Sequence, residues 1–379
     1  MMRRMRTLLP LIIGSLMISG CGVSSNYLEI EDLMLVQSLG FDRSESEICI
    51  SIASEADPKG GSPKAVSGRG RSASAALLNA TEQSMEKEIY LAHVGQLLIG
   101  QQAAEEGMKP FLDYVCRDAD IRMDIPLYLV KGDGADEFML SCGDGNTGIG
   151  HILQGVKESF ESHGSAKVFS LAELCLSLQR SGSGLLCAVE LSESSESTEG
   201  EKAKTAAPAG FAIIREGRLC GFIDMEERAG LGLLLGNMPQ IPLELKDSRG
   251  RDLVLELSSG SCRLSPLWSA EGTLVGIDVQ AQVKASLLEC HAQGQQELDY
   301  AVAQLEKEIS RQLSVLLRQS MDLKADYLGI AGKLERADPK GYSSIEDSFM
   351  ELLPALELEL SVSGKLSHGN DVRDDGAGK

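Results

Sequence analysis

The sequence is poor in aromatic residues and in basic ones. Aromatic residues make up 4% of its 379 residues, with one Trp, and 36 Lys and Arg stand against 56 Asp and Glu, for a formal net charge of −20. Proteins that bind nucleic acids need clustered cations for the phosphates and aromatic rings for stacking on the bases. The composition therefore argues against a nucleic-acid-binding protein.

The sequence also lacks the local patterns of common catalytic and metal sites. It has no C-x-x-C, no two histidines at an H-x-x-x-H spacing and no G-x-S-x-G, so neither a zinc site nor a hydrolase serine is supported. The glycine-rich residues 143–150 (GDGNTGIG) lack the Lys-Ser/Thr of a phosphate loop and the closing Glu of a calcium loop, and we predict a connecting loop there. We expect no cofactor, no metal and no enzymatic activity.

Only the N-terminus has an extended apolar run. Arg3, Arg4 and Arg6 precede about eleven mostly apolar residues, 8–18, which is too short for a spanning helix and typical of a secretory signal peptide over residues 1–20. The run ends in Ile-Ser-Gly-Cys at Cys21, the pattern in which a bacterial cysteine receives a diacylglyceryl group; a plain signal peptide with a chance cysteine is the alternative.

The predicted lipid anchor sets the expected location of the mature chain. Removing residues 1–20 removes three arginines, so the net charge changes from −20 to −23. Such a body is repelled by anionic lipid, and we expect two acyl chains on Cys21, not a basic patch, to hold it at the outer face of the membrane.

Helix and strand patterns alternate over the first half of the mature chain. Apolar residues predict strands at 33–39, 47–53 and 90–99, a half-buried strand around 125–129, and helices at 72–88 and 103–115. We predict an N-terminal α/β domain over residues 21–191. Residues 192–206 hold no large apolar side chain and are predicted to be a linker or a long loop.

The second half shows strands and one long helix. A hairpin turning at Glu216 and Gly217 belongs to a predicted small β-rich middle domain, residues 207–265. Residues 266–366 contain alternating strands and an apolar stripe along 295–319, which predict a C-terminal α+β domain whose antiparallel sheet is covered by the helix. Residues 367–379 are predicted to form a flexible tail. The fold class is therefore α+β, with several domains.

Several short motifs, in order, resemble one family. They are LEIEDL and LGFD (Glu29, Asp32, Gly40, Asp42), LAHV and IG (His93, Gly100), RDADIR (Arg117, Arg122), LCGFID and EERAG (Gly221, Glu226, Gly230), and KADYLGI (Asp326, Gly329). With the lipid cysteine, they are similar to the Ger(x)C lipoproteins, the C subunits of bacterial spore germinant receptors. The family usually has Trp-Asp after the cysteine, where this chain has Gly22-Val23.

The resemblance implies a function and partners. It implies a three-domain lipoprotein on the outer face of the spore inner membrane, associated with an A subunit that has membrane helices and a B subunit that resembles amino-acid transporters. Because the nutrient pocket is generally placed in the B subunit, this chain is expected to be structural or signal-relaying. A solute-binding lipoprotein that serves a transporter and a surface-anchored hydrolase are the alternatives.

Individual side chains leave two interpretations each. His93, on a predicted strand, is a hydrogen-bonded structural residue or has a proton or partner role. Arg117 and Arg122, near Asp118 and Asp120, form an ion-pair cluster or a docking edge. Glu29 and Asp32 lie at a solvated strand edge or meet basic loops of a membrane subunit. Four cysteines lie in apolar runs and are predicted to be buried free thiols: Cys49, Cys116, Cys187 and Cys220. One or two disulfides are the alternative.

Overall fold

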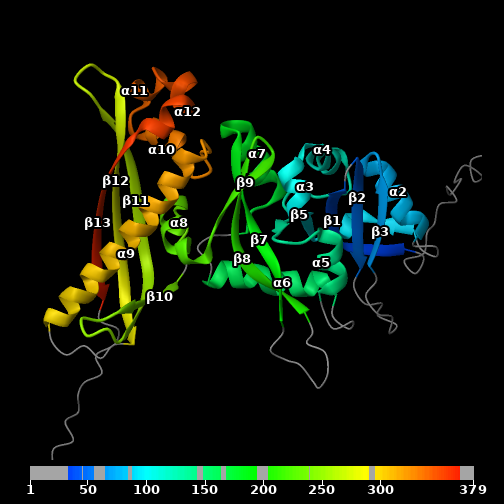
Figure 1. Cartoon of the computed structure of the whole chain (residues 1–379), viewed down its shortest axis with the longest axis horizontal. Coiled ribbons are helices and arrows are strands. Elements are labelled where there is room, and N and C mark those ends of the chain that lie inside the picture. Colours follow the sequence, from blue (N-terminus) through cyan, green and yellow to red (C-terminus); the bar gives the residue numbers. More distant parts are fainter. Residues whose placement is uncertain are drawn as a thin grey trace, which may run out of the picture.

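Two β-sheets of different size divide the chain between them (Figure 1). The computed structural model describes residues 33–44, 46–54, 65–83, 88–142, 148–163, 168–193, 204–238, 240–289 and 295–367. The signal peptide, Cys21, Glu29, Asp32, most of the glycine-rich segment 143–150 and most of the predicted tail lie outside these residues.

The larger sheet contains nine strands and runs in the order β3-β2-β1-β5-β6-β7-β8-β9, with β4 beside β1. The strands are β1 (Leu33–Ser44), β2 (Glu47–Ser54), β3 (Ala65–Gly70), β4 (Glu88–Tyr90), β5 (Gln96–Gly100), β6 (Leu127–Val130), β7 (Ser183–Glu193), β8 (Lys204–Arg215) and β9 (Arg218–Ile223). Strands β1, β5, β6 and β7 are parallel, and antiparallel strands flank them on both sides. A parallel centre is covered on both faces, and every residue of β5 and β6 is accordingly buried.

Helices cover both faces of this sheet. One face is covered by α2 (Ala73–Gln83), α3 (Gln101–Glu106), α4 (Lys109–Arg117) and α7 (Leu171–Ser181), whose side chains pack into one core. The rings of Phe41 and Phe111 are stacked in this core. The opposite face is covered by α5 (Ala135–Ser141) and α6 (Ile149–His163).

The smaller sheet has the order β10-β11-β12-β13. Its strands are β10 (Ile241–Lys246), β11 (Asp252–Trp268), β12 (Leu274–Glu289) and β13 (Glu357–Ser367). The helical elements of this half are η3 (Met225–Glu227), α8 (Arg228–Leu235), α9 (Gln295–Asp322), α10 (Ile330–Ala337), α11 (Pro339–Ser343), η4 (Glu346–Ser348), α12 (Phe349–Leu352) and η5 (Leu353–Ala355). As predicted, the long helix α9 lies across the apolar face of this sheet (Figure 1).

One core continues from the first sheet into the second. The buried residues behind α5 and α6 form a single cluster with those of α8, α9 and the smaller sheet. Figure 1 shows α8 between β8 and α9, at the place where this cluster crosses from one half to the other.

The predicted hairpin through Glu216 and Gly217 is present, since both residues have positive φ and Arg215 pairs with Arg218. Residues 192–206 do not separate two domains, because β7 and β8 are neighbours that pair as far as Glu193 and Lys204. Strands from residues 207–265 are divided: β8 and β9 complete the larger sheet, and β10 and β11 belong to the smaller one. The rest of the predicted linker or long loop, residues 194–203, lies outside the described residues.

Four further local predictions differ from the structure. The predicted strand at 90–99 is interrupted by the 3₁₀ turn η2 (Leu91–His93). The helix predicted at 103–115 is two helices, because Gly107 has a φ of 127° and ends α3. The smaller sheet is not wholly antiparallel, since β13 runs parallel to β12. The strand around 125–129 is buried on both faces, not half-buried.

Candidate functional site

The joint, as we call the contact of α8, β8 and β9 with α9 and the segment 323–331, holds four of the predicted motif residues. Its closest approach is at Gly230, near the start of α8. The amide N–H of Gly230 donates to Oε1 of Gln312 on α9 at 2.8 Å, and both residues are buried. A Cβ atom on Gly230 would lie 2.8 Å from Cβ of Gln312. Glycine is therefore required for the two helices to pack at this distance.

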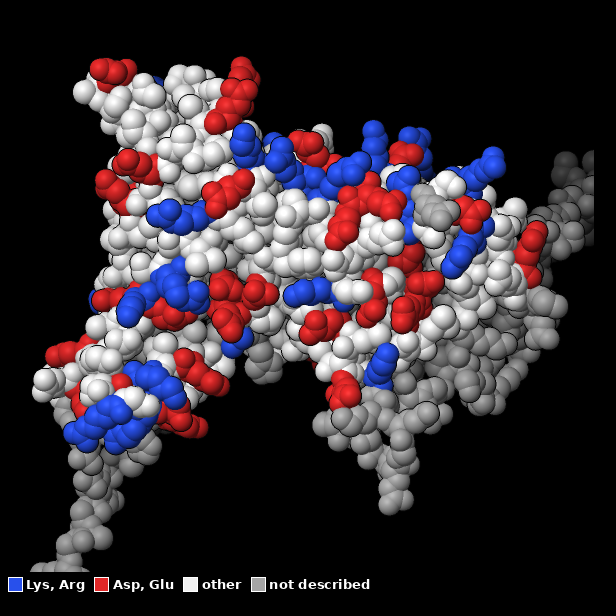
Figure 2. Space-filling view, in the orientation of Figure 1, with Lys and Arg blue, Asp and Glu red and all other residues white. Residues whose placement is uncertain are grey.

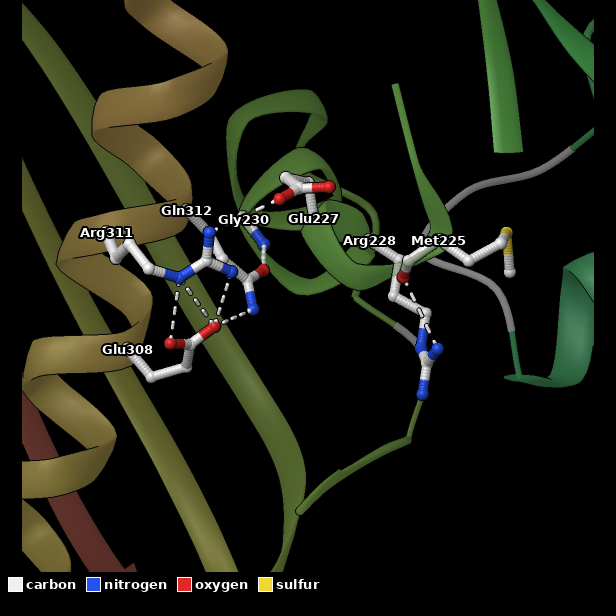
Figure 3. A network of polar contacts seen from close by, with 7 residues as sticks. All are labelled: Met225, Glu227, Arg228, Gly230, Glu308, Arg311 and Gln312. Carbon is white, nitrogen blue, oxygen red and sulfur yellow. Dashed lines mark hydrogen bonds and ion pairs between the residues drawn. The ribbon is translucent and has the colours of Figure 1, made fainter. Parts of the chain in front are cut away.

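A polar network surrounds this contact (Figure 3). Gln312 Nε2 donates to Glu308 at 2.9 Å, while Arg311 pairs with Glu308 at 2.7 Å and reaches across to Glu227 at 3.3 Å. Burial raises the pKa of Glu308, but the hydrogen bonds from Arg311 and Gln312 outweigh it and hold that pKa below its usual value. The network thus fixes a charged carboxylate beside the start of α8.

Strands β8 and β9 reach the same region from the first sheet. Arg215 on β8 donates to the carbonyl oxygen of Leu323 at 2.9 Å, and Gln319 on α9 donates to the carbonyl oxygen of Phe222 on β9 at 2.8 Å. A Cβ on Gly221 would lie 3.2 Å from Leu323 Cδ1, so this position also accommodates a close neighbour. These contacts join the end of α9 to the last hairpin of the larger sheet.

The segment after α9 is held by Asp326. Its buried carboxylate accepts hydrogen bonds from the backbone N–H groups of Ile330 at 2.6 Å and Ala331 at 2.9 Å, which supplies a cap for α10. Gly329 enters the helix with a φ of 65°, a conformation that favours glycine. Burial raises the pKa of Asp326. The Ser181 hydroxyl, from the end of α7, donates to the carbonyl oxygen of Asp326 at 3.4 Å.

A second group of motif residues meets at the start of α5. The carboxylate of Asp42, at the end of β1, accepts the backbone N–H groups of Ala135 at 2.7 Å and Asp136 at 2.8 Å. A Cβ on Gly100 would lie 2.0 Å from Asp42 Oδ1, and one on Gly40 would lie 2.7 Å from the sulfur of Met139 on α5. The two glycines thus make room for a side chain that holds a helix 93 residues further along the chain.

An open cleft of about 370 Å³ lies beside Asp42 and is lined by polar and charged side chains, among them Arg43, Arg69, Glu105 and Asp136. Burial raises the pKa of Asp42 to about 6, against the effect of the two backbone hydrogen bonds. Within the described residues, no group of three or more His, Cys, Asp and Glu side chains is arranged to hold a metal ion.

The remaining motif residues that the structure describes are exposed. His93 lies in the turn η2, where its ring is 5.7 Å from that of Tyr90, so it is not a buried strand residue as predicted. Arg117 pairs with Asp113 and Arg122 with Asp124, not with the predicted partners Asp118 and Asp120. Glu226 is exposed, and its neighbour Glu227 is the residue that enters the joint.

Exposed cations gather on one edge of the molecule despite its negative charge. Figure 2 shows Lys and Arg side chains along the edge formed by α4, β9 and α7. The exposed cations of these elements are Lys109, Arg117, Arg180 and Arg218. A groove of about 580 Å³ beside α4 is lined by three arginines, Arg43, Arg71 and Arg117, and by two carboxylates, Asp113 and Asp118. The alternative in which Arg117 forms a docking edge for a partner would therefore involve this cationic edge.

The joint depends on residues that the motifs do not contain. Arg215, Glu308, Arg311 and Gln312 make its cross-contacts, and none was predicted from the sequence. One signal existed: Gln312 is a polar residue inside the apolar stripe of α9, which is where a buried hydrogen bond is needed.

Known families and structures match this chain over most of its length. A family model described as "Spore germination protein N-terminal domain" matches residues 26–191, and one described as "Spore germination B3/ GerAC like, C-terminal" matches residues 209–369. No curated protein matched the sequence.

The fold is similar to the crystal structure of the GerBC protein. The TM-score is 0.57 at 16% sequence identity, over 86% of this chain and 96% of that one. At this identity the likeness shows a shared fold. The boundary between the two matched models falls in the β7–β8 hairpin, inside the larger sheet.

Proposed function

The chain belongs to the Ger(x)C family, the C subunits of spore germinant receptors, and we propose that it is a lipid-anchored, non-catalytic subunit that relays a nutrient signal within the receptor. It assembles with the A and B subunits at the outer face of the spore inner membrane. The diacylglyceryl group on Cys21 anchors it there. Within the described residues, no helix is long and apolar enough to cross a bilayer.

The use of the motif residues is the observation that carries this proposal. The carboxylates of Asp42 and Asp326 accept hydrogen bonds from backbone N–H groups. Gly100 and Gly230 allow neighbouring elements to pack closely. These are the roles of residues that set the relative positions of elements. A catalytic constellation would instead direct a nucleophile and a base toward a shared open space.

Anchoring and relay are related physically. Confinement to the membrane surface raises the effective concentration of the body for membrane partners. The two halves of the body share one core, and hydrogen bonds and an ion pair hold the joint between them. A displacement caused by a partner on one half is then transmitted to a partner on the other. We expect the exposed cationic edge over α4 and β9 to be one of these docking surfaces.

Replacing Cys21 tests the anchor. Cys21→Ala should lose the diacylglyceryl mass, detected by mass spectrometry of the N-terminal peptide, and should slow nutrient-triggered germination. Cys262→Ala, a half-buried cysteine of the smaller sheet, is the matched control and should retain both. Normal germination by an unlipidated Cys21→Ala protein would refute the anchoring role.

Purification of a tagged copy from spore membranes tests the partners. Two polytopic companions in the eluate would support the receptor assignment. If the chain were a solute-binding lipoprotein, the purified body alone would bind a small ligand by calorimetry. Ligand affinity with no polytopic companion would overturn the proposal.

A further inference from the structure

Two cysteine thiols from different helices meet at the surface of the larger sheet's helical cover. Cys116 lies in the last turn of α4 and is exposed, and Cys175 lies in α7 and is half-buried. Their Sγ atoms are 3.7 Å apart, although the residues are 59 positions apart in sequence. Closing a disulfide needs a further approach of roughly 1.6 Å, since the bonded sulfurs lie about 2.05 Å apart. Rotation of the two side chains supplies a movement of that size.

The other cysteines of the described residues have different surroundings. Cys49, Cys142 and Cys187 are buried, the last of them completely. Cys220 donates its S–H to the carbonyl oxygen of Ile213. Within the described part of the chain, the sulfurs of Cys116 and Cys175 are the one pair in contact. The approach of the two sulfurs is therefore set by the places that α4 and α7 take in one shared core.

We propose that Cys116 and Cys175 are an oxidation site, at which a disulfide joins α4 to α7 in the exported protein. The oxidant is itself a disulfide, a small molecule or a thiol-oxidising protein. The Cys116 thiolate attacks one sulfur of that oxidant, which forms a mixed disulfide and releases one thiol. The Cys175 thiolate then attacks the Cys116 sulfur and releases the second thiol. Two protein thiols are oxidised and one oxidant disulfide is reduced, with both protons transferred to the departing thiolates.

The environments of the two residues determine the order of these steps. Cys116 is exposed and meets the oxidant first. Burial raises the pKa of Cys175 to about 12, with a further contribution from its hydrogen bond to Cys116, so Cys175 remains a thiol in the reduced protein. Its attack follows once the mixed disulfide on Cys116 places an electrophilic sulfur beside it.

The disulfide would stabilise one particular surface. It would close a loop from α4 to α7 that contains the segment with Arg122 and the strand β6. Helices α4 and α7 pack into the same core, so the bond would join two parts of one cover. The groove beside α4 that is lined by Arg117, the neighbour of Cys116, would then be held in one arrangement.

Oxidation of the purified chain tests the site directly. Wild type, Cys116→Ser and the control Cys262→Ser are incubated with oxidised glutathione, free thiols are blocked with iodoacetamide, and unreduced tryptic peptides are analysed by mass spectrometry. Wild type and Cys262→Ser should each lose two blockable thiols and yield one peptide pair that joins Cys116 to Cys175. Cys116→Ser should yield no such pair, with an unchanged far-UV circular dichroism spectrum.

A second measurement uses the protein from its own location. Chain extracted from dormant spores in the presence of iodoacetamide should carry the Cys116–Cys175 cross-link and no alkyl group on either cysteine. The proposal is overturned if glutathione remains attached to Cys116 without transfer, if other cysteines pair instead, or if both residues are alkylated in the spore extract. The lipid mass on Cys21 in the same extract reports separately whether the proposed export took place.

Discussion

Replacing Gln312 by methionine should weaken the joint while leaving both sheets in place. The Gln312 side chain is 1% exposed, and it accepts from Gly230 on α8 and donates to Glu308 on its own helix. Methionine has a similar volume and no rotamer branching, so it fills the same space, but its sulfur is a weak acceptor. The substitution therefore removes hydrogen bonds with little loss of packing.

The magnitude follows from which groups lose a partner. The N–H of Gly230 lies in the first turn of α8, where no carbonyl of its own helix is available, and no side chain at the N-cap, Glu227, bonds it. Leaving such a buried donor unpaired costs about 1–3 kcal/mol. Glu308 keeps its bonds from Arg311, so loss of the Gln312 donor there adds roughly 0.5–1 kcal/mol. The expected loss of stability is thus about 1.5–4 kcal/mol, or roughly 2–5 °C in the unfolding midpoint of a chain of this length.

Thermal unfolding of the purified protein, followed by far-UV circular dichroism, measures this loss. Gln304→Met is the matched control, because Gln304 is half-buried on the same helix and its side chain makes no hydrogen bond within the described residues; it should change the midpoint by less than about 1 °C. Hydrogen exchange gives a second readout, since the Gly230 amide should lose protection before the strands do. Equal midpoints for the two variants would refute the reasoning that Gln312 caps α8.

Three further substitutions test the α5 cluster and the continuity of the core. Gly100→Ala would place a Cβ 2.0 Å from Asp42 and should destabilise the protein by about 2 kcal/mol or more in urea unfolding, whereas Gly155→Ala, with nothing within 4 Å, should stabilise α6 by roughly 0.5–1 kcal/mol. Because burial raises the pKa of Asp42 from 3.8 to about 6, the folded state binds its proton more tightly, and stability should fall by about 2 kcal/mol as pH rises from 4 to 6; Asp42→Asn should remove this fall in urea titrations across pH 4–7. Trp268, the single Trp, lies in the smaller sheet, and its fluorescence should report the same lowered midpoint for Gly100→Ala as circular dichroism does; an unshifted fluorescence transition would contradict a continuous core.

Periodicity predicted the elements better than their connections. The stripe from Leu305 to Leu316 located α9, and the Glu216-Gly217 turn located the β8–β9 hairpin, because each is a local pattern with a local cause. The parallel pairing of β13 with β12 has no local cause, since the alternation of side chains is the same in either direction. The chain between β12 and β13 contains α9 and five shorter helical elements, and a connection of that length can return the last strand in either direction.

The motifs located the right positions without revealing their partners. Asp42 and Gly100 were picked out in separate motifs, and the structure shows that they meet because β1 and β5 are adjacent parallel strands. Gln312 interrupts the apolar stripe of α9, which signals a buried hydrogen bond but does not identify its partner. Arg311 gave no signal, because a charged residue on a long amphipathic helix has the same pattern whether it faces water or another helix. Only the docking of α8 decides between the two, and that docking depends on contacts 82 residues apart.

To relay a signal between partners, the two halves of the chain would have to keep one relative orientation. The joint fixes that orientation through two kinds of contact. The apolar cluster shared by the halves holds them together without specifying an angle, because burial of apolar surface is non-directional. The directional bonds of Gln312, Arg311 and Arg215 specify the angle, and satisfied buried polar networks have that effect in general. It follows that a variant such as Gln312→Met should impair germination more than its loss of stability alone accounts for. A core substitution of equal thermal cost that leaves the network intact, such as Leu264→Ala in β11, should impair it less.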